Sequence, residues 1–423
     1  MVRTAFSEQM DRLRTGIFLL AVVLVNFTIS RPSPVDIAFA LALLMTPLCG
    51  QRLTRRGLVF LALILAWWAG LMTSSMPFTY DGEVVYQLTK TSYAMSIGIT
   101  ACLVNMHWGR QQIERLYKFW IGSACLAATF ATIGFVLKID ELIWDGRGKG
   151  FFDDPNMYAA FLPPAVLGCI YFILTTKTRR RYIAALALLT IGLMVAFSRV
   201  AVAATLLTGL VLTLFLNRKR LAKTIMNLAA VAAVAVIAGA IAVAVIPEFA
   251  EKLSDRATLA KDYDVGEMGR LNRYLKAFNL TINDPIGMGV LQFEAIFPEP
   301  IHNFWLSSFV NYGWLAGFAW TAVVYFGVIL TIRNYRQTGD SLMVLIYLSW
   351  LGIFACALLH EAERWRHLWF FTGFLWGVNP HNWRQTVRAP APASPPRDIR
   401  AAPAMARHLP PHPGLLRQKP SVS

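Results

Sequence analysis

Apolar residues occur along this chain in long runs that are separated by short charged segments. A helix needs about 20 residues to cross a hydrocarbon core of about 30 Å, and most of these runs approach that length. The pattern therefore predicts an all-α polytopic membrane protein with about twelve transmembrane helices. We expect them at residues 16–30, 35–49, 57–75, 85–106, 117–137, 157–175, 182–197, 200–216, 224–246, 304–332, 341–359 and 367–378.

Basic residues are distributed unequally between the two ends of the predicted helices. The segments on the side of the N-terminus contain 26 Lys and Arg, the opposite side contains 13, and Lys90 lies inside a predicted span. Cytoplasmic loops carry the excess of Lys and Arg in membrane proteins. We therefore expect both termini to be cytoplasmic and the other face to be external.

The composition agrees with this topology and excludes an ordinary soluble enzyme. Hydrophobic residues make up 56% of the 423 residues, and charged residues only 15%. A net charge of +16 would suggest a nucleic-acid partner in a soluble protein. Here the basic residues follow membrane orientation, so we expect contact with a lipid bilayer and no nucleic-acid binding.

The chain divides into a membrane domain, residues 1–380, and a tail, residues 381–423. The tail is basic and rich in Pro and Ala, which predicts a disordered cytoplasmic extension. Two external loops, about 138–156 and 247–301, are longer than simple connections require, and long loops often carry function. The second loop contains an apolar stripe at helical spacing, formed by Leu271, Leu275, Phe278 and Ile282.

Arginines near the external face are candidates for binding a diphosphate. Arg199 stands at the junction of two predicted spans, where an arginine is costly and usually has a function. Arg270 and Arg273 share a face of the amphipathic helix with Lys276, and guanidinium groups match phosphate oxygens in pairs. The competing interpretations are an interfacial arginine that reaches the headgroups and a solvated helix face.

His302 follows a proline-stiffened segment at the mouth of a predicted span. A histidine with a pKa near 6.5 in this position can accept a proton from a sugar hydroxyl. Asn303 could orient the histidine or bind the sugar. The alternative is a structural role for the histidine.

Two further external segments are rich in ionisable residues. In the first, Arg147, Lys149 and Asn156 are candidates for substrate binding, although Asn156 or Asp154 could instead cap the following helix. In the second, residues 360–367, His360 and Arg364 are the candidates. Interfacial charges that pair with one another beside a Trp anchor are an equally good interpretation of that segment.

The Asp262-Tyr263-Asp264 spacing resembles that of metal-dependent nucleotide-sugar transferases. The predicted location faces away from the cytoplasmic nucleotide sugars, and a match of three residues arises easily by chance. We therefore expect no metal and no other cofactor.

Five motifs in order resemble the bacterial O-antigen ligase/polymerase family. The resemblance covers about residues 10–380, and its specificity comes from the order and spacing of the motifs. They are Gly150-Phe-Phe-Asp-Asp-Pro-Asn-Met-Tyr-Ala159, Phe197-Ser-Arg-Val-Ala201, Gly269-Arg-Leu-Asn-Arg-Tyr, Asp284-Pro-Ile-Gly-Met-Gly289 and His302-Asn-Phe-Trp-Leu306.

The resemblance implies a metal-independent glycosyltransferase with the membrane-embedded C-type fold. Such a protein acts on undecaprenyl-diphosphate-linked glycans at the outer face of the bacterial inner membrane. On this resemblance Arg199 and Arg270 match diphosphate-contacting arginines, and His302 matches a loop histidine that activates the acceptor. Attack by the acceptor in line with departure of the lipid diphosphate predicts inversion at the anomeric carbon.

Three functions are compatible with the sequence. We favour a polymerase of exopolysaccharide or O-antigen repeat units that works with flippase and chain-length or export proteins. Second is a ligase that transfers the glycan to lipid A core. From another class, a lipid-linked glycan flippase or transporter would show similar spans. Spans 57–75 and 224–246 contain no charged residue, however, and span 117–137 contains only Lys118, at its edge.

Overall fold

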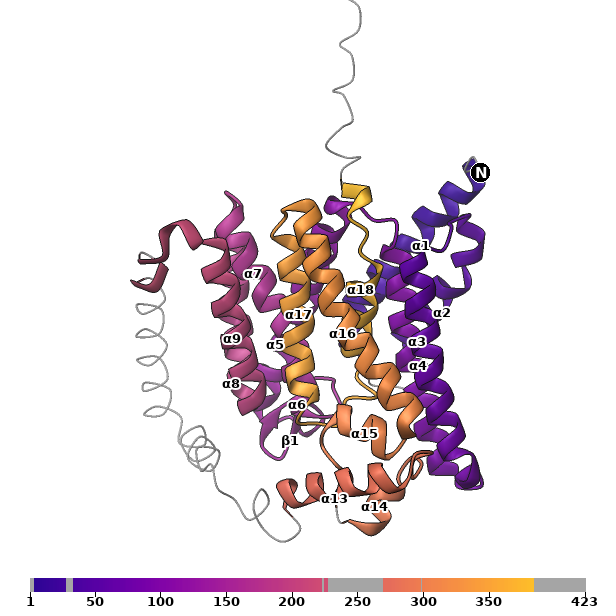
Figure 1. The fold of residues 1–423 in the computed structure, drawn as a ribbon. Helices are drawn as coiled ribbons and strands as arrows, with labels where there is room; N and C mark the ends of the chain where they lie inside the picture. Colours follow the sequence, from indigo (N-terminus) through magenta and orange to yellow (C-terminus); the bar gives the residue numbers. More distant parts are fainter. Residues whose placement is uncertain (1–3, 28–32, 223, 227–268, 298, 384–423) are drawn as a thin grey trace, which may run out of the picture.

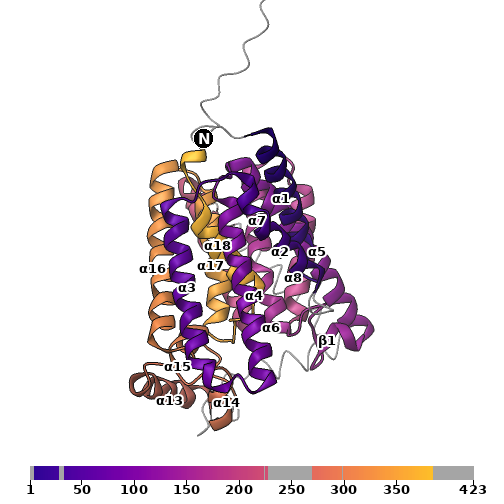
Figure 2. The ribbon, with the colours of Figure 1, turned by 90° about the vertical axis from the view of Figure 1, so that its right-hand side faces the viewer.

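The computed structural model describes residues 4–27, 33–222, 224–226, 269–297 and 299–383, and Figure 1 shows a bundle of helices. Figures 1 and 2 agree that α13 and α14 lie together at one end of the bundle and that the N-terminus lies at the other. The helices are α1 (Ala5–Leu24), α2 (Pro34–Leu44), α3 (Arg55–Ser75), α4 (Gly82–Asn105), α5 (Arg110–Leu137), α6 (Pro155–Phe161), α7 (Pro163–Thr175), α8 (Arg180–Val195), α9 (Arg199–Leu216), α13 (Arg270–Asn283), α14 (Gln292–Ile296), α15 (Phe304–Val310), α16 (Gly313–Thr338), α17 (Leu342–Ala357) and α18 (Arg366–Gly377).

The prediction of an all-α polytopic membrane protein is confirmed. Among the described residues five helical segments are long and apolar enough to cross a membrane, and α2 and α17 are shorter apolar helices. The predicted span 224–246 and the predicted tail 381–423 fall almost entirely outside the described residues. The five long segments are Arg55–Phe78, Arg110–Leu137, Pro155–Thr175, Arg199–Leu216 and Gly313–Thr338.

The prediction of one continuous span over residues 304–332 is wrong, because the structure divides it into α15 and α16. A loop inserts beside the break and takes up backbone groups that a continuous helix would have paired. The amides of Met288 and Gly289 donate to the carbonyls of Val310 and Asn311, each at 2.9 Å. Gly313 sits at the break with φ +78°, and a Cβ atom there would collide with the backbone of Ile286.

The predicted span 157–175 corresponds to the segment Pro155–Thr175, in which α6 and α7 meet at Leu162. Pro163 and Pro164 follow this residue and have no N–H group to donate to the preceding turn. The break leaves α6 as a short helix of seven residues. The one sheet in the described residues lies beside it, an antiparallel pair of β1 (Ile143–Trp144) and β2 (Arg147–Gly148).

Helices α4 and α18 approach each other so closely that their backbones touch. A Cβ atom built on Gly373 would overlap the carbonyl oxygen of Gly98, and one built on Gly98 would lie 2.8 Å from the carbonyl oxygen of Trp369. The Asn105 side-chain amide donates to the carbonyl of Phe374 at 2.9 Å and closes the same interface. These contacts join the second half of α4 to α18 along most of its length.

We expect Gly373→Ala to destabilise the protein by about 1–3 kcal/mol, because the added methyl group meets backbone atoms that have no rotamer to change. Thermal unfolding in detergent measures the loss. Gly122→Ala on α5 is the control, since a Cβ atom at Gly122 meets nothing within 4 Å. Equal stability of Gly373→Ala and wild type would contradict the close approach of α4 and α18.

Candidate active site

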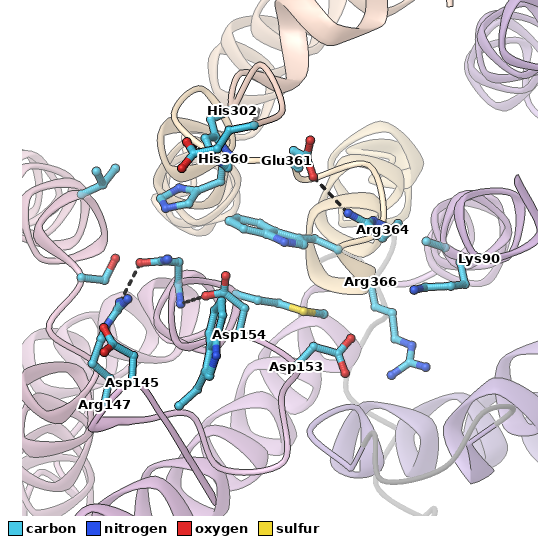
Figure 3. Close-up of a pocket in the computed structure, with 18 of the residues that line it drawn as sticks. Lys90, Asp145, Arg147, Asp153, Asp154, His302, His360, Glu361, Arg364 and Arg366 are labelled. Carbon is cyan, nitrogen blue, oxygen red and sulfur yellow. Dashed lines mark hydrogen bonds and ion pairs between the residues drawn. The ribbon is translucent and has the colours of Figure 1, made fainter. Parts of the chain in front are cut away.

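Figure 3 shows a cavity of about 1030 Å³, which is lined in part by the segment before α15 and the loop between α17 and α18. Its lining comes from the first residues of several helices and from the loops between them. The ionisable side chains that line it are Asp36, Lys90, Asp145, Arg147, Asp153, Asp154, Arg199, Glu299, His302, His360, Glu361, Arg364 and Arg366. Segments that are as far apart in sequence as α2 and α18 therefore meet in one polar space.

Arg147 is buried in the cavity wall and joins three segments. Its Nε donates to the carbonyl of Ala196 at 2.8 Å, and its Nη2 donates to Oδ1 of Asn156 at 2.8 Å. Asn156 stands in the first turn of α6, where the carboxylate of Asp154 accepts the Asn156 amide and caps the helix. Arg147 and Asn156 thus line the cavity as expected of binding residues, while Asp154 has the capping role.

Arg199 is an exposed residue that lines the cavity and opens α9. The first turn of a helix presents unpaired N–H groups and the positive end of the helix dipole. A guanidinium group at this position therefore adds its charge to a site that already favours an anion. Phe197, two residues earlier, has φ +48° and turns the chain sharply between α8 and α9.

His302 lies on another side of the cavity, before α15. Its Nε2 is 3.8 Å from Oε2 of Glu299, and its carbonyl accepts a hydrogen bond from the Tyr274 hydroxyl at 3.1 Å. Phe304, which opens α15, is fully buried with its ring centroid 4.6 Å from that of Trp320. The anchored helix and the two side-chain contacts hold the imidazole at the cavity.

Backbone strain is concentrated around this cavity. Among the described residues, five non-glycine residues have positive φ, and three of them, Asp145, Phe197 and His302, line the cavity. Such conformations cost about 1–3 kcal/mol each and persist where the surrounding structure imposes them, most often at functional sites. The strain marks the cavity independently of its charges.

Arg273, Asn303 and Lys149 do not line the cavity. Arg273 is buried, and its Nη2 pairs with Oε2 of Glu299 at 2.9 Å while its Nη1 donates to the carbonyl of Pro300 at 2.9 Å. Its place is therefore behind the cavity wall, where it holds the segment before His302.

Local backbone geometry explains the other two positions. Asn303 caps α15 by accepting the Leu306 amide at 3.0 Å, and Lys149 donates to the carbonyl of Glu141 at 2.8 Å. Arg270 begins α13, and its side chain lies outside the described part of the structure.

The loop between α17 and α18 contributes His360, Glu361 and Arg364 to the cavity. Nδ1 of His360 donates to the carbonyl of Cys356 at 2.9 Å, which leaves the lone pair of the neutral ring on Nε2. Arg364 pairs with Glu361 at 3.1 Å and donates to Oε1 of Gln87 at 2.7 Å. Burial, with a smaller contribution from Glu363, raises the pKa of Glu361 to about 8.

The sequence reasoning missed the wall that α4 forms with the starts of α2 and α18. Lys90 lines the cavity with its Nζ 4.5 Å from the centroid of the Tyr86 ring. Arg366 pairs with Asp36 at 2.8 Å and lies 5.7 Å from the centroid of the Tyr93 ring. The position of Lys90 inside a predicted span was a sequence signal for this wall. The pairing of Asp36 with Arg366 gave no such signal, because the two residues are 330 positions apart in sequence.

Within the described residues, no group of three or more His, Cys, Asp and Glu side chains is arranged to hold a metal ion. Asp262 and Asp264 lie outside the described residues.

Residues 184–321 match the family model described as O-Antigen ligase. The match confirms the resemblance to the O-antigen ligase/polymerase family. The matched O-antigen ligase region includes Arg199 and His302, which the fold brings to one cavity, and also Arg270 and Arg273. No curated protein matches the chain.

We expect Glu361 to make the stability of the protein depend on pH. Its pKa in the folded state, about 8, is above the ordinary value of 4.5, so folding favours the protonated carboxyl. The stabilisation is complete at low pH and is lost as the pH rises through about 8. Thermal unfolding in nanodiscs from about pH 5 to about pH 9 measures this loss.

Glu361→Gln should remove most of this pH dependence, because the amide cannot ionise. Glu141→Gln, at an exposed position outside the cavity lining, is the matched control and should keep the wild-type profile. An unchanged profile in Glu361→Gln would show that another group titrates.

Proposed function

We propose that this protein is a membrane-embedded glycosyltransferase that uses a polyprenyl-diphosphate-linked glycan as donor. The match to an O-antigen ligase model supports glycosyl transfer by a membrane protein of this type. The observation that carries the proposal is the meeting of Arg147, Arg199 and His302 in one strained cavity, which the predicted topology places at the external face. Nucleotide sugars are absent outside the cytoplasm, so the donor there must bring its own leaving group.

In the proposed reaction the leaving group is undecaprenyl diphosphate, whose negative charge grows as the bond from the anomeric carbon to the phosphate oxygen breaks. Arg199 lies exposed at the start of α9, where its guanidinium and the helix N-terminus can stabilise that charge. Arg270 is proposed to contact the same diphosphate. This assistance requires no metal ion, because guanidinium groups supply the donors.

In the same reaction His302 is the proposed base. It takes the proton of the acceptor hydroxyl as the hydroxyl oxygen forms its bond to the anomeric carbon. The carboxylate of Glu299, 3.8 Å away, stabilises the imidazolium that results. Attack opposite the departing diphosphate inverts the anomeric configuration.

Between the two activities of the family we propose polymerisation of repeat units of an exopolysaccharide or O-antigen. The external segment Pro247–Ile301 contains 6 basic and 9 acidic residues. A net negative segment repels the phosphorylated lipid A core that a ligase must admit more than it repels a neutral repeat unit. The protein would act in the bacterial inner membrane with both termini in the cytoplasm, beside flippase and chain-length or export proteins.

Arg199→Lys tests the diphosphate contact, because lysine keeps the charge and loses the planar pair of donors. We expect kcat/KM to fall by more than about tenfold with a lipid-linked donor, and a chelator to change little. Arg110→Lys is the control, since Arg110 lies outside the cavity lining and pairs with Asp340 at 2.7 Å. Full activity of Arg199→Lys would show that a positive charge is sufficient at this position. Inhibition by a chelator would instead favour Asp262 and Asp264 as metal ligands.

His302→Ala tests the base. We expect transfer to be abolished while the protein still inserts and unfolds at nearly the wild-type temperature, because the imidazole lines a cavity and fills no core. Normal turnover by the inserted variant would remove His302 from the mechanism.

Deletion of the gene distinguishes the two activities. We expect single repeat units to accumulate on the lipid carrier, or on core where a separate ligase exists. Mass spectrometry of the extracted lipid-linked glycans measures their length. Long glycans stranded on undecaprenyl diphosphate would make ligation the better proposal.

A further inference from the structure

The cavity wall formed by α4 and the start of α18 has no role in the proposed steps. Tyr86, Lys90 and Tyr93 reach it from successive turns of α4, and Arg366 reaches it from the start of α18. The contact between Gly98 and Gly373 fixes these two helices relative to each other. The wall is therefore a preformed surface.

Lys90 lies in the third turn of α4 and is half-buried, and a half-buried ammonium needs polar partners that replace water. Its ammonium is held 4.5 Å from the Tyr86 ring centroid. A lysine that served only as a solvated surface charge would not need to line a cavity beside other ionisable side chains. Its placement indicates a ligand on this wall.

The charges of the wall indicate the class of that ligand. Both contacts of Arg366 with Asp36 are made by Nη2, at 2.8 and 3.1 Å, so Nε and Nη1 are not used in this pair. Figure 3 shows Asp153 on the same side of the cavity as Lys90 and Arg366. Two cations and two carboxylates sum to zero, whereas a diphosphate needs an excess of cations.

A sugar ring fits this combination. Its hydroxyl groups both donate and accept hydrogen bonds, so it can use the ammonium and guanidinium donors together with a carboxylate acceptor. Its C–H faces are apolar and pack against aromatic rings, and Tyr86 and Tyr93 offer such rings beside the charged groups. An aromatic ring or a charged group alone does not favour a sugar over other ligands. Here each cation lies beside a tyrosine ring, Lys90 beside Tyr86 and Arg366 beside Tyr93, and this combination favours a sugar.

We propose that Lys90 and Arg366, with Tyr86 and Tyr93, form the subsite for the terminal neutral sugar of the acceptor glycan. This inference rests on the proposed glycosyl transfer. Figure 3 shows Arg147 on one side of the cavity and Lys90 and Arg366 on the other. An acceptor held on the second side approaches the anomeric carbon from the face opposite a diphosphate held on the first, as in-line attack requires.

Binding and turnover of Lys90→Met test the subsite. Methionine keeps most of the apolar side chain and removes the ammonium donors. With purified protein in nanodiscs we expect the KM for acceptor glycan to rise by about tenfold or more, with the donor KM and kcat changed less than about threefold. Lys118→Met is the matched control, because Lys118 also lies over an aromatic ring, 5.7 Å from Phe172, and is outside the cavity lining.

Saturation-transfer NMR with two probes separates the subsite from the transfer reaction. The probes are the free repeat-unit oligosaccharide, released from its lipid diphosphate, and inorganic diphosphate. Lys90→Met should weaken binding of the oligosaccharide and leave diphosphate binding unchanged. If the wild type binds the oligosaccharide through Lys90 but transfers nothing from any lipid-linked donor, the subsite stands and the proposed function fails.

Two outcomes would overturn the subsite. Weaker diphosphate binding in Lys90→Met would make the wall a second anion site, and unchanged binding of both probes would leave Lys90 without a ligand. Tyr86→Phe and Tyr86→Ala provide a second test that keeps the charges intact. The phenylalanine variant should retain oligosaccharide binding, since it keeps the ring, and the alanine variant should lose it.

Discussion

The arrangement of the cavity depends on the buried guanidinium of Arg147. A buried charged group must be hydrogen-bonded, and leaving a buried donor without its acceptor costs about 1–3 kcal/mol or more. Arg147 meets this requirement with the carbonyl of Ala196 and the side chain of Asn156. Because these partners belong to the α8–α9 junction and to α6, the charge can be accommodated only when both segments are in place. Arg199, three residues after Ala196, is positioned by the same contact.

A second buried arginine has the corresponding role on the other side of the cavity. Arg273 on α13 binds Glu299 and the carbonyl of Pro300, and Glu299 in turn lies beside His302. These two arginines, Arg147 and Arg273, are buried and hold segments of the chain, whereas the Arg199 side chain is exposed at the cavity. Charge alone does not identify a positioning arginine, but burial and the backbone carbonyls that it binds do.

The sequence predicted features that depend on local patterns and did not predict those that depend on contacts between separate segments. Runs of apolar residues located the helices, because the membrane imposes a minimum length on them. They did not show the break between α15 and α16, which exists because residues 284–289 supply hydrogen bonds from a distant part of the chain. Interactions of this kind leave no local pattern.

The same limit applies to the site. Arg199 and His302 were recognisable because each interrupts an apolar context at the edge of a span. Arg273 looked equally suited to phosphate, since its partner Glu299 is 26 residues away and nothing local links the two. Lys90 was visible as a charged residue in a span, but its meaning required Arg366 and Asp36, which only the packing of α18 on α4 brings near.

The balance of charge in the cavity bears on turnover. Five Lys and Arg side chains line it together with six Asp and Glu side chains, and one of these acids, Glu361, has a pKa raised to about 8. A strongly positive cavity would bind the lipid diphosphate tightly both before and after transfer, which lowers KM without accelerating the reaction. Carboxylates near the arginines weaken that uniform attraction. In the proposed transfer, the arginine donors would then contribute most when the leaving oxygen gains charge in the transition state, and the diphosphate product would depart from a cavity that is close to neutral.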